Sequence, residues 1–397
     1  MSNSKIRYID EVDIKNQRVL LRADFDVSLN PNFTIADDAR IHSNLPTINY
    51  LLKNNNRLIC IAKLDRPKKR DPQLSLNIVV KRLRQYIPGY TIKLVEDFLT
   101  DTTLLEKQKE KEILMLENIR FYPEEKQGDK EFSKKLASLG DVYVNDAFAM
   151  CHRKDASITG IPHYLPSYGG LLLKKEITVI SKATKNPKKP FVAIIGGAKI
   201  ETKINVINKL TEIADYVLIG GALANTFLCA HGYEIGKSYC QLEYVNMARK
   251  LLLLASQKKT AVIIPSDVVI GNPNNSVHGG KVVKVDEIPK GAVVLDIGPE
   301  TQAKYGSVIA KAKTIVWNGP IGYMENPAFK RGTDFIYYAI SDNRSATSIV
   351  GGGDTLGAIS KKEYLDKITH ISTGGGAMLE FIEKGSLPGI EALRSRD

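Results

Sequence analysis

Short apolar runs alternate with longer amphipathic or polar stretches in the first part of the chain. The runs are Arg18–Val27, Arg57–Ala62, Ile92–Val95, Ile113–Leu116 and Val142–Val144. Apolar runs separated by helix-length segments are typical of βα units. The pattern therefore predicts a mostly parallel sheet with helices covering its faces.

The second part of the chain repeats this alternation. Its apolar runs are Phe191–Ile195, Tyr216–Ile219, Ala261–Ile264, Val293–Ile297, Thr314–Trp317, Ser348–Val350 and Thr369–Ser372. Between two of these runs, the segment Glu243–Ala255 aligns six side chains on one helical stripe. They are Tyr244, Met247, Ala248, Leu251, Leu252 and Ala255. A second α/β domain is therefore predicted.

A helix followed by a proline-rich segment separates the two parts. The helix is predicted over Leu171–Ala183, and the sequence Thr-Lys-Asn-Pro-Lys-Lys-Pro that follows it is typical of a solvated linker. We place the domain boundary near Pro187. The predicted domains are residues 1–186 and 187–386.

The composition is that of a packed globular protein. Of 397 residues, 43% are hydrophobic and 25% are charged, and the longest apolar runs, such as Leu251–Ala255, are far shorter than the roughly 20 residues that span a bilayer. The polar segment Met1–Asp13 does not have the pattern of a secretory signal. We expect no transmembrane helix and a cytoplasmic location.

Charge and cysteine content narrow the possible partners. The formal net charge of +12 favours anionic ligands without specifying their kind. The four cysteines form no Cys-x-x-Cys pair and have no histidine at zinc spacing, so we expect reduced thiols. They are Cys60, Cys151, Cys229 and Cys240.

Glycine follows strand after strand in the second domain. The pairs and triplets are Gly196-Gly197, Gly220-Gly221, Asn318-Gly319-Pro320, Gly351-Gly352-Gly353 and Gly374-Gly375-Gly376. Loops at the carboxyl ends of parallel strands form the ligand crevice of open α/β sheets, where backbone N–H groups favour phosphate. A single pair would be explained by a tight turn, but five together predict a nucleotide site. Neither G-x-x-x-x-G-K-[ST] nor G-x-G-x-x-G is present.

Three charged residues beside these loops fit a polyphosphate. Lys199 and Lys203 are four residues apart, and we expect them to share one face at the start of a helix. Asp354 follows the triple glycine and could hold Mg²⁺ beside phosphates or cap a helix. The alternative for each lysine is a solvated surface position.

Arginines follow the strands of the first domain. Arg22, Arg66, Arg120 and Arg153 lie at or beyond strand ends, and Arg40 precedes a helical segment. Guanidinium groups bind carboxylate and phosphate in bidentate fashion, so this set predicts a small, highly anionic substrate. Surface salt bridges are the alternative. Nucleic acid is a weaker candidate because the densest basic run, Lys63–Arg70, contains no aromatic residue.

Eight motifs, in order along the chain, resemble those of phosphoglycerate kinases. They are Arg22-Ala-Asp-Phe-Asp-Val27, Asp38-Ala-Arg40-Ile41, Leu116-Glu-Asn-Ile-Arg-Phe-Tyr-Pro123, Val144-Asn-Asp-Ala-Phe148, Gly196-Gly-Ala-Lys-Ile200, Trp317-Asn-Gly-Pro320, Gly351-Gly-Gly-Asp-Thr355 and Ser372-Thr-Gly-Gly-Gly-Ala377. The resemblance covers essentially the whole chain. It implies two Rossmann-like, three-layer (αβα) lobes with mostly parallel sheets, joined by a hinge helix, with residues 387–397 returning to the first lobe.

The resemblance also implies a reaction and its ligands. The enzyme would transfer a phosphoryl group reversibly from 1,3-bisphosphoglycerate to Mg-ADP, giving 3-phosphoglycerate and ATP in glycolysis, as a monomer. The first lobe would bind the glycerate through Asp24, Phe25, Asp26, Arg40, Lys63, Arg66, Arg120 and Arg153. The second lobe would bind ADP or ATP through Gly197, Lys199, Lys203, Gly220, Gly221, Asn318, Pro320, Glu325, Gly352, Gly353, Asp354 and Thr355. Arg40, Lys199, Gly353 and Gly376 would take part in transfer, and Asp354 would bind Mg²⁺.

Three places near the expected glycerate site depart from the family pattern. Asp26 replaces an asparagine. Ala62-Lys-Leu-Asp-Arg-Pro67 replaces Ser-His-Leu-Gly-Arg-Pro, so that Lys63 stands for a histidine and Asp65 for a glycine, and Ala149-Met-Cys-His-Arg153 replaces Gly-Thr-Ala-His-Arg. We hypothesise that Asp26 and Lys63 form a compensating ion pair, and that Asp65 pairs with Lys68 or Arg70. These departures motivate one alternative, a diverged kinase for another acyl phosphate. The net charge of +12 motivates a second, a non-catalytic anion-binding paralogue, which would bind polynucleotides in a salt-sensitive manner.

Overall fold

The computed structural model describes residues 5–274, 280–357 and 362–394, and the chain divides into two compact units. The first unit runs to Thr178 and resumes at Ser386, and the second comprises Val179–Gly385. The division lies within helix α6 (Leu171–Lys185), whereas the sequence placed it at 186/187. Both units are α/β, which confirms the predicted fold class.

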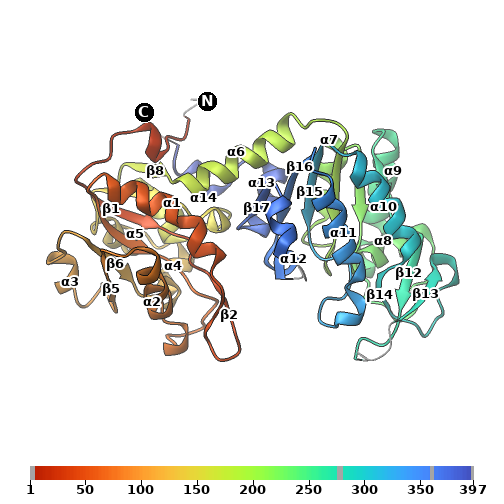
Figure 1. The fold of residues 1–397 in the computed structure, drawn as a ribbon, viewed down its shortest axis with the longest axis horizontal. Helices are drawn as coiled ribbons and strands as arrows, with labels where there is room; N and C mark the ends of the chain where they lie inside the picture. Colours follow the sequence, from red (N-terminus) through yellow and green to blue (C-terminus); the bar gives the residue numbers. More distant parts are fainter. Residues whose placement is uncertain (1–4, 275–279, 358–361, 395–397) are drawn as a thin grey trace. The chain divides into compact units, whose positions relative to one another are not determined.

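The first unit contains a six-stranded parallel sheet in the order β5-β6-β4-β1-β7-β8 (Figure 1). The strands are β1 Arg18–Arg22, β4 Arg57–Ile61, β5 Thr91–Val95, β6 Glu112–Leu116, β7 Val142–Asn145 and β8 Ser167–Gly169. The helices are α1 Ala39–Lys53, α2 Asn77–Tyr86, α3 Thr103–Glu106, α4 Pro123–Gln127, α5 Lys130–Ala137 and α14 Pro388–Glu391. A short hairpin, β2 Ser28–Leu29 and β3 Ile35–Asp37, follows β1.

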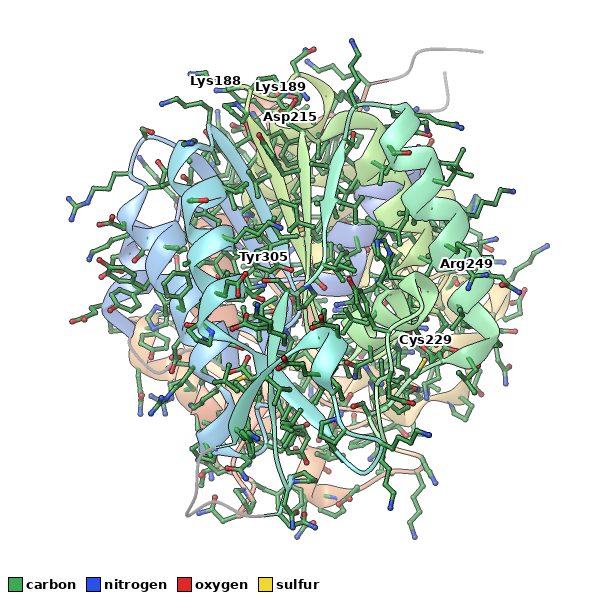
Figure 2. All side chains as sticks on the ribbon, turned by 90° about the vertical axis from the view of Figure 1, so that its right-hand side faces the viewer. Lys188, Lys189, Asp215, Cys229, Arg249 and Tyr305 are labelled. Atoms are coloured by element: carbon green, nitrogen blue, oxygen red, sulfur yellow. The ribbon has the colours of Figure 1, made fainter. Side chains whose placement is uncertain are left out.

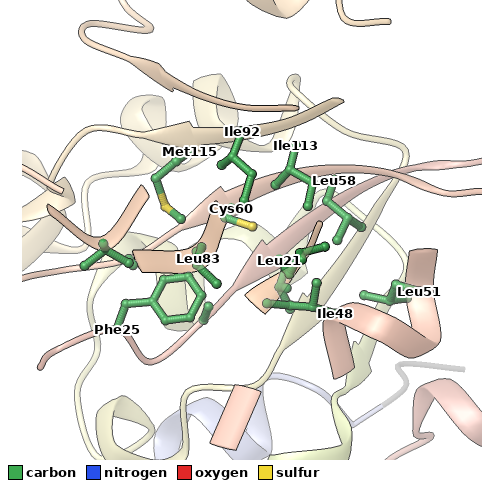
Figure 3. Packing of buried hydrophobic residues seen from close by; sticks show 14 of the residues in the cluster. Leu21, Phe25, Ile48, Leu51, Leu58, Cys60, Leu83, Ile92, Ile113 and Met115 are labelled. Carbon is green, nitrogen blue, oxygen red and sulfur yellow. The ribbon is translucent and has the colours of Figure 1, made fainter. Parts of the chain in front are cut away.

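The core of this unit lies between the sheet and helices α1 and α2. Leu21, Leu58 and Ile113 from three neighbouring strands meet Ile48 of α1 and Leu83 of α2, all at most 1% exposed (Figure 3). Strands buried on both faces explain why the sequence shows continuous apolar runs rather than alternation.

The second unit contains a six-stranded parallel sheet in the order β11-β10-β9-β15-β16-β17 and a separate antiparallel sheet, β13-β12-β14. The strands are β9 Phe191–Ile195, β10 Tyr216–Ile219, β11 Ala261–Ile263, β12 Asp267–Ile270, β13 Lys281–Lys284, β14 Val294–Ile297, β15 Thr314–Asn318, β16 Thr347–Gly351 and β17 His370–Ser372. The helices are α7 Ile204–Ile213, α8 Leu223–His231, α9 Val245–Gln257, α10 Pro299–Lys311, α11 Arg331–Asp342, α12 Gly353–Gly357 and α13 Gly375–Lys384.

Aromatic side chains join this sheet to α10 and α11. Trp317 of β15 contacts Tyr337 of α11 edge-on, with ring centroids 4.9 Å apart. The buried Tyr305 hydroxyl of α10 donates to the carbonyl oxygens of Ile219 and Ile263 at 2.6 and 3.0 Å (Figure 2). Tyr305 thereby ties α10 to the ends of two strands.

Two details differ from the sequence prediction. The run ending at Ile297 forms β14 of the antiparallel sheet and not a strand of the parallel one. On α9, Ala248, Leu251 and Ala255 are buried as expected, but Met247 is 49% exposed. The stripe that faces the core is therefore narrower than predicted.

The proline-rich segment after α6 is anchored on the second unit. Lys189 Nζ donates to the Ile213 carbonyl at 2.7 Å and lies 3.2 Å from Asp215, and the Pro190 carbonyl accepts from Lys313 and Thr314 (Figure 2). Its lysine side chains are exposed, but its backbone is hydrogen-bonded. These bonds explain why the division between the units comes before this segment.

The last turn of the described chain belongs to the first unit. The Gly389 N–H of α14 donates to the Cys151 carbonyl at 2.8 Å, and Ile6 and Arg394 form an antiparallel bridge. A Cβ at Gly389 would lie 2.7 Å from Ile158, so the close packing of α14 requires glycine there.

A buried carboxyl group holds the start of α6. Asp146 follows β7, and its Oδ1 accepts the Leu173 N–H at 3.0 Å. A Cβ at Gly170 would lie 2.2 Å from this carboxyl, so only glycine permits the approach. A helix N-terminus favours an anion, but burial outweighs this effect and raises the pKa of Asp146 to about 7.

This pKa predicts a stability change with pH. An unfolded aspartate titrates near pH 4, so between about pH 4 and pH 7 the folded chain binds more protons at Asp146, and its contribution to stability falls as pH rises. Asp146→Asn abolishes this titration. The free energy of unfolding of Asp146→Asn, relative to the parent, should therefore rise by about 2 to 3 kcal/mol from pH 5 to pH 8 in urea titrations.

The control is Asp141→Asn, which removes an exposed carboxylate just before the same strand. It should show no comparable difference between the two pH values. An equal effect of Asp146→Asn at both pH values would contradict the prediction.

Candidate functional site

The glycine loops of the second unit meet at one edge of its parallel sheet. Gly197 donates its N–H to the Pro320 carbonyl at 2.7 Å, and Gly221 donates to Ile321 at 2.8 Å. Gly221 and Gly319 have φ values of +68° and +90°, and a Cβ on either would lie within 2.4 Å of backbone atoms of the loop after β9. These glycines are therefore needed for packing of the loops against one another.

A cavity of about 840 Å³ opens beside these loops. Six of the predicted nucleotide residues line it, namely Gly197, Lys199, Gly221, Pro320, Glu325 and Gly353. Much of the remaining wall is apolar, including Leu228, Pro265, Val268 and Leu295. An apolar cavity with a few polar groups has the character of a small-molecule site.

Other predicted nucleotide residues hold the loops together. Asn318 is buried and its amide donates to the Gly351 carbonyl at 2.8 Å. The Thr355 hydroxyl donates to the same carbonyl and accepts the Gly319 N–H at 2.8 Å. Gly220 packs against Ile321, and Gly352 has a φ of +112°. The side chain of Asp354 lies outside the described residues.

The two lysines do not share a helix face, contrary to the prediction. Helix α7 begins only at Ile204, because the preceding loop turns at Gly197 and is held by Gln241, whose Oε1 accepts the Ile200 N–H at 2.7 Å. Lys203 donates to the Gly196 carbonyl at 2.6 Å. The Lys199 side chain is 62% exposed and lies at the cavity.

Sequence reasoning missed Asp296 of β14, which also lines the cavity. Its carboxylate accepts the N–H groups of Ile297 and Gly332 at 2.9 and 2.8 Å. Burial raises the pKa of Asp296 to about 7. The signal was an aspartate inside an otherwise apolar run.

Charged side chains gather at the carboxyl edge of the first unit's sheet. Arg40 Nη1 donates to both oxygens of Asp24 at 2.7 and 2.6 Å, and Asp24 is 1% exposed. The Asp24 charge raises the pKa of Arg40. Asn44 fixes Asp24 through its backbone, accepting the N–H at 3.2 Å and donating to the carbonyl. The guanidinium is thus held in place by a buried counter-charge.

The remaining arginines fall into two groups. Arg66 and Arg153 are exposed. Arg120 donates to Asp155 at 2.5 Å, while its Nη1 is buried without a hydrogen-bond partner in the described part of the chain. Arg22 is fully buried and donates to Ser157 and to the Ala23 carbonyl. The prediction that Arg22 belongs to the anion site is therefore wrong. Its hydrogen bonds are made inside the unit, and Glu125 accepts a hydrogen bond from the same serine, Ser157.

Phe25, a predicted glycerate residue, is fully buried in the core beside α2 (Figure 3). Its ring has no exposed surface for a ligand. Asp26 and Lys63 form an ion pair, as hypothesised, and Lys63 is 7% exposed.

The family model described as phosphoglycerate kinase matches residues 9–385. The chain belongs to the phosphoglycerate kinase family. It is 44% identical to the phosphoglycerate kinase of Dictyoglomus turgidum over all of both chains, and 41% identical to "Phosphoglycerate kinase, cytosolic" of Nicotiana tabacum over 97% of each. The phosphoglycerate kinase structure from Coxiella burnetii superimposes with a TM-score of 0.85 at 35% identity, covering 98% of this chain and 99% of that one.

Membership of the phosphoglycerate kinase family establishes the activity. The protein is a phosphotransferase with a carboxyl group as acceptor, and it interconverts 1,3-bisphosphoglycerate and ADP with 3-phosphoglycerate and ATP in glycolysis. Among the residues that the structure describes, no helix has the length and apolar character needed to cross a bilayer.

Asp65 stands where the resemblance to the family leads us to expect glycine, and its backbone conformation is one that glycine adopts readily. Its φ is +55°, in the left-handed region that aspartate tolerates better than most residues. The predicted ion pairs with Lys68 or Arg70 are wrong, since neither occurs in this described segment. Arg70 instead donates to the Glu96 carbonyl at 2.9 Å.

The φ of Asp65 predicts an unusual order of substitution effects. Asp65→Gly should remain within about 0.5 kcal/mol of the parent, whereas Asp65→Ala should lose about 1 kcal/mol or more, because a Cβ is strained at positive φ. Urea unfolding measures both. At Lys68 of the same loop, where φ is negative, alanine should be more stable than glycine. If the glycine and alanine variants ranked in the same order of stability at Asp65 and at Lys68, the argument from φ would be disproved.

Proposed function

We propose that the first unit binds 3-phosphoglycerate or 1,3-bisphosphoglycerate and that the cavity of the second unit binds ADP or ATP. The observation that carries this proposal is the Arg40–Asp24 pair, in which a guanidinium is held by a buried carboxylate at a sheet edge rich in cations. Asp26, Lys63, Arg66, Arg120 and Arg153 would complete the glycerate site. Phe25 would contribute through its backbone, because its side chain is buried.

In the second unit, some of the proposed residues would contact the nucleotide and others would hold the loops that surround it. Lys199 and Glu325 are exposed at the cavity and would contact phosphate and ribose. Lys203, Gly220, Asn318, Gly352 and Thr355 would shape the loops that receive the nucleotide. Gly353 and Gly376 have no positive φ, and a Cβ on either would meet no atom of the described residues within 4 Å. Since packing does not require glycine there, approach of a ligand to the backbone would explain it.

Magnesium accompanies the nucleotide in this proposal, with Asp354 as its protein ligand. Asp354 is the second residue of α12, between Gly353 and Gly357, which both line the cavity. Residues 5–274, 280–357 and 362–394 contain no cluster of three His, Cys, Asp or Glu ligands. A single carboxylate fits Mg²⁺, which takes one or two carboxylates and completes its shell with phosphate oxygens and water. When bound, the ion would neutralise phosphate charge.

Phosphoryl transfer then depends on positioning and charge neutralisation, without a covalent intermediate. Arg40 would neutralise the transferring group from the glycerate side and Lys199 from the nucleotide side. Because the ligands are bound by different units, the units must bring them together and exclude water. We propose α6, which belongs partly to each unit, as the hinge. The tobacco relative named cytosolic supports a cytoplasmic location.

Arg40→Lys tests the role of Arg40. The lysine keeps the charge beside Asp24 but loses the planar fork, so turnover of Mg-ATP and 3-phosphoglycerate should fall by about 100-fold or more, with little change in the KM for ATP. A coupled dehydrogenase that consumes 1,3-bisphosphoglycerate measures the rate, and thermal unfolding verifies the fold.

The matched control is Arg57→Lys, at an exposed position at the amino end of β4, away from the carboxyl edge. It should retain parental turnover. Parental activity in Arg40→Lys would remove Arg40 from the proposed mechanism.

A further inference from the structure

The Asp26 carboxylate is bound by two donors from one loop. Lys63 Nζ donates to its Oδ2, and the Asp65 N–H donates to its Oδ1 at 2.8 Å. We name these two donors the anion seat. An ammonium group and a backbone N–H that converge on one carboxylate form the kind of charge-assisted site that binds carboxylate or phosphate oxygens.

The Lys63 side chain needs an anion because it is nearly buried. It is 7% exposed, and burial lowers its pKa although Asp26 opposes this effect. Asp24, the other carboxylate close to Lys63, is committed to Arg40. Removal of Asp26 would therefore leave a buried cation without its direct partner, a costly state that an external anion would relieve.

Asp26 itself is more accessible than its partner. The Asp26 side chain is 26% exposed and the Lys63 side chain 9% exposed. The carboxylate is therefore the member of the pair that solvent reaches more easily. A dissolved anion that approached Lys63 would compete with Asp26 for the same two donors.

We propose that Asp26 is a specificity-determining residue that occupies the anion seat as an internal anion and thereby excludes inorganic anions from these two donors, while the arginines of the same sheet edge remain available to the substrate. The proposal rests on the proposed function in that it assumes the acid substrate binds at this sheet edge. Its consequence is that dissolved sulfate and phosphate bind the anion seat weakly, and that Asp26 and Lys63 take part in the glycerate site as a mutually neutralised pair.

The test uses Asp26→Asn and sodium sulfate as the probe. Asparagine retains an oxygen for the Asp65 N–H but no longer neutralises Lys63. At constant ionic strength, titration calorimetry should show that sulfate binds Asp26→Asn at least about fivefold more tightly than the parent. Sulfate should also inhibit Asp26→Asn more strongly, in competition with 3-phosphoglycerate and not with ATP.

Two further variants separate the anion seat from a general charge effect. Asp13→Asn removes a carboxylate from an exposed pair with Lys15 at 3.0 Å, so it changes the net charge equally and should leave sulfate affinity at the parental value. Asp26→Asn combined with Lys63→Met removes the seat's cation and should lose the gain in sulfate affinity. Thermal unfolding verifies that each variant is folded.

The outcomes distinguish this inference from the proposed function. An unchanged sulfate affinity in Asp26→Asn, an equal gain in Asp13→Asn, or a gain that persists without Lys63 would overturn the inference. Sulfate inhibition that competes with ATP would also overturn it, because the ion would then bind elsewhere. Turnover in the parent, and its loss in Arg40→Lys, tests the proposed function independently of these results.

Discussion

The register of parallel strands is the constraint on which both candidate sites depend. In the second unit, β15 pairs with β9 and β16 so that Ile195, Asn318 and Gly351 lie side by side at one edge. The loops that leave these positions must pass one another at backbone distance, and a Cβ at Gly196 would lie 2.2 Å from the Pro320 carbonyl oxygen. The sheet thus determines where the loops meet, and glycine makes the meeting sterically possible.

In the first unit, positive charges gather at the carboxyl edge of the sheet. Because burial removes water from a cation, a buried one needs a carboxylate or another hydrogen-bond acceptor as its partner. Arg40 and Arg120 each donate to a nearly buried aspartate, Asp24 and Asp155. Guanidinium groups tolerate such positions because they remain charged and bind carboxylates directionally. Burial lowers the pKa of Lys63, so its ammonium group loses its proton more readily than a guanidinium does. Lys63 therefore depends more on its partner Asp26 than the two arginines depend on theirs. The acidic residues of this site are therefore as necessary as its basic ones, and net charge alone describes it poorly.

Much of this architecture could be predicted from the sequence, because buried parallel strands leave continuous apolar runs. Strands β1, β4, β9 and β15 all coincide with such runs. The strands that were missed are the hairpin strands β2 and β3, the three-residue strand β8, and β12 and β13, all of which are short or partly polar. Their formation depends on pairing with other segments, and local periodicity carries little information about such pairing. The start of α7 was missed for a similar reason, since Gln241, some 40 residues away, holds the preceding loop.

The roles of single site residues also depend on contacts with distant segments that the sequence does not reveal. Sequence motifs identified glycines and cations, but only the structure separates Gly319, which packing requires, from Gly353 and Gly376, which packing does not require. Glycine loses more conformational entropy on folding than other residues do. Where its φ is ordinary and the space around its Cα is open, no packing or backbone requirement offsets this loss. Gly291 on an exposed turn has the same two properties, so open space alone does not identify a ligand contact. For Gly353 it is the position in the cavity wall that supports the proposed nucleotide contact.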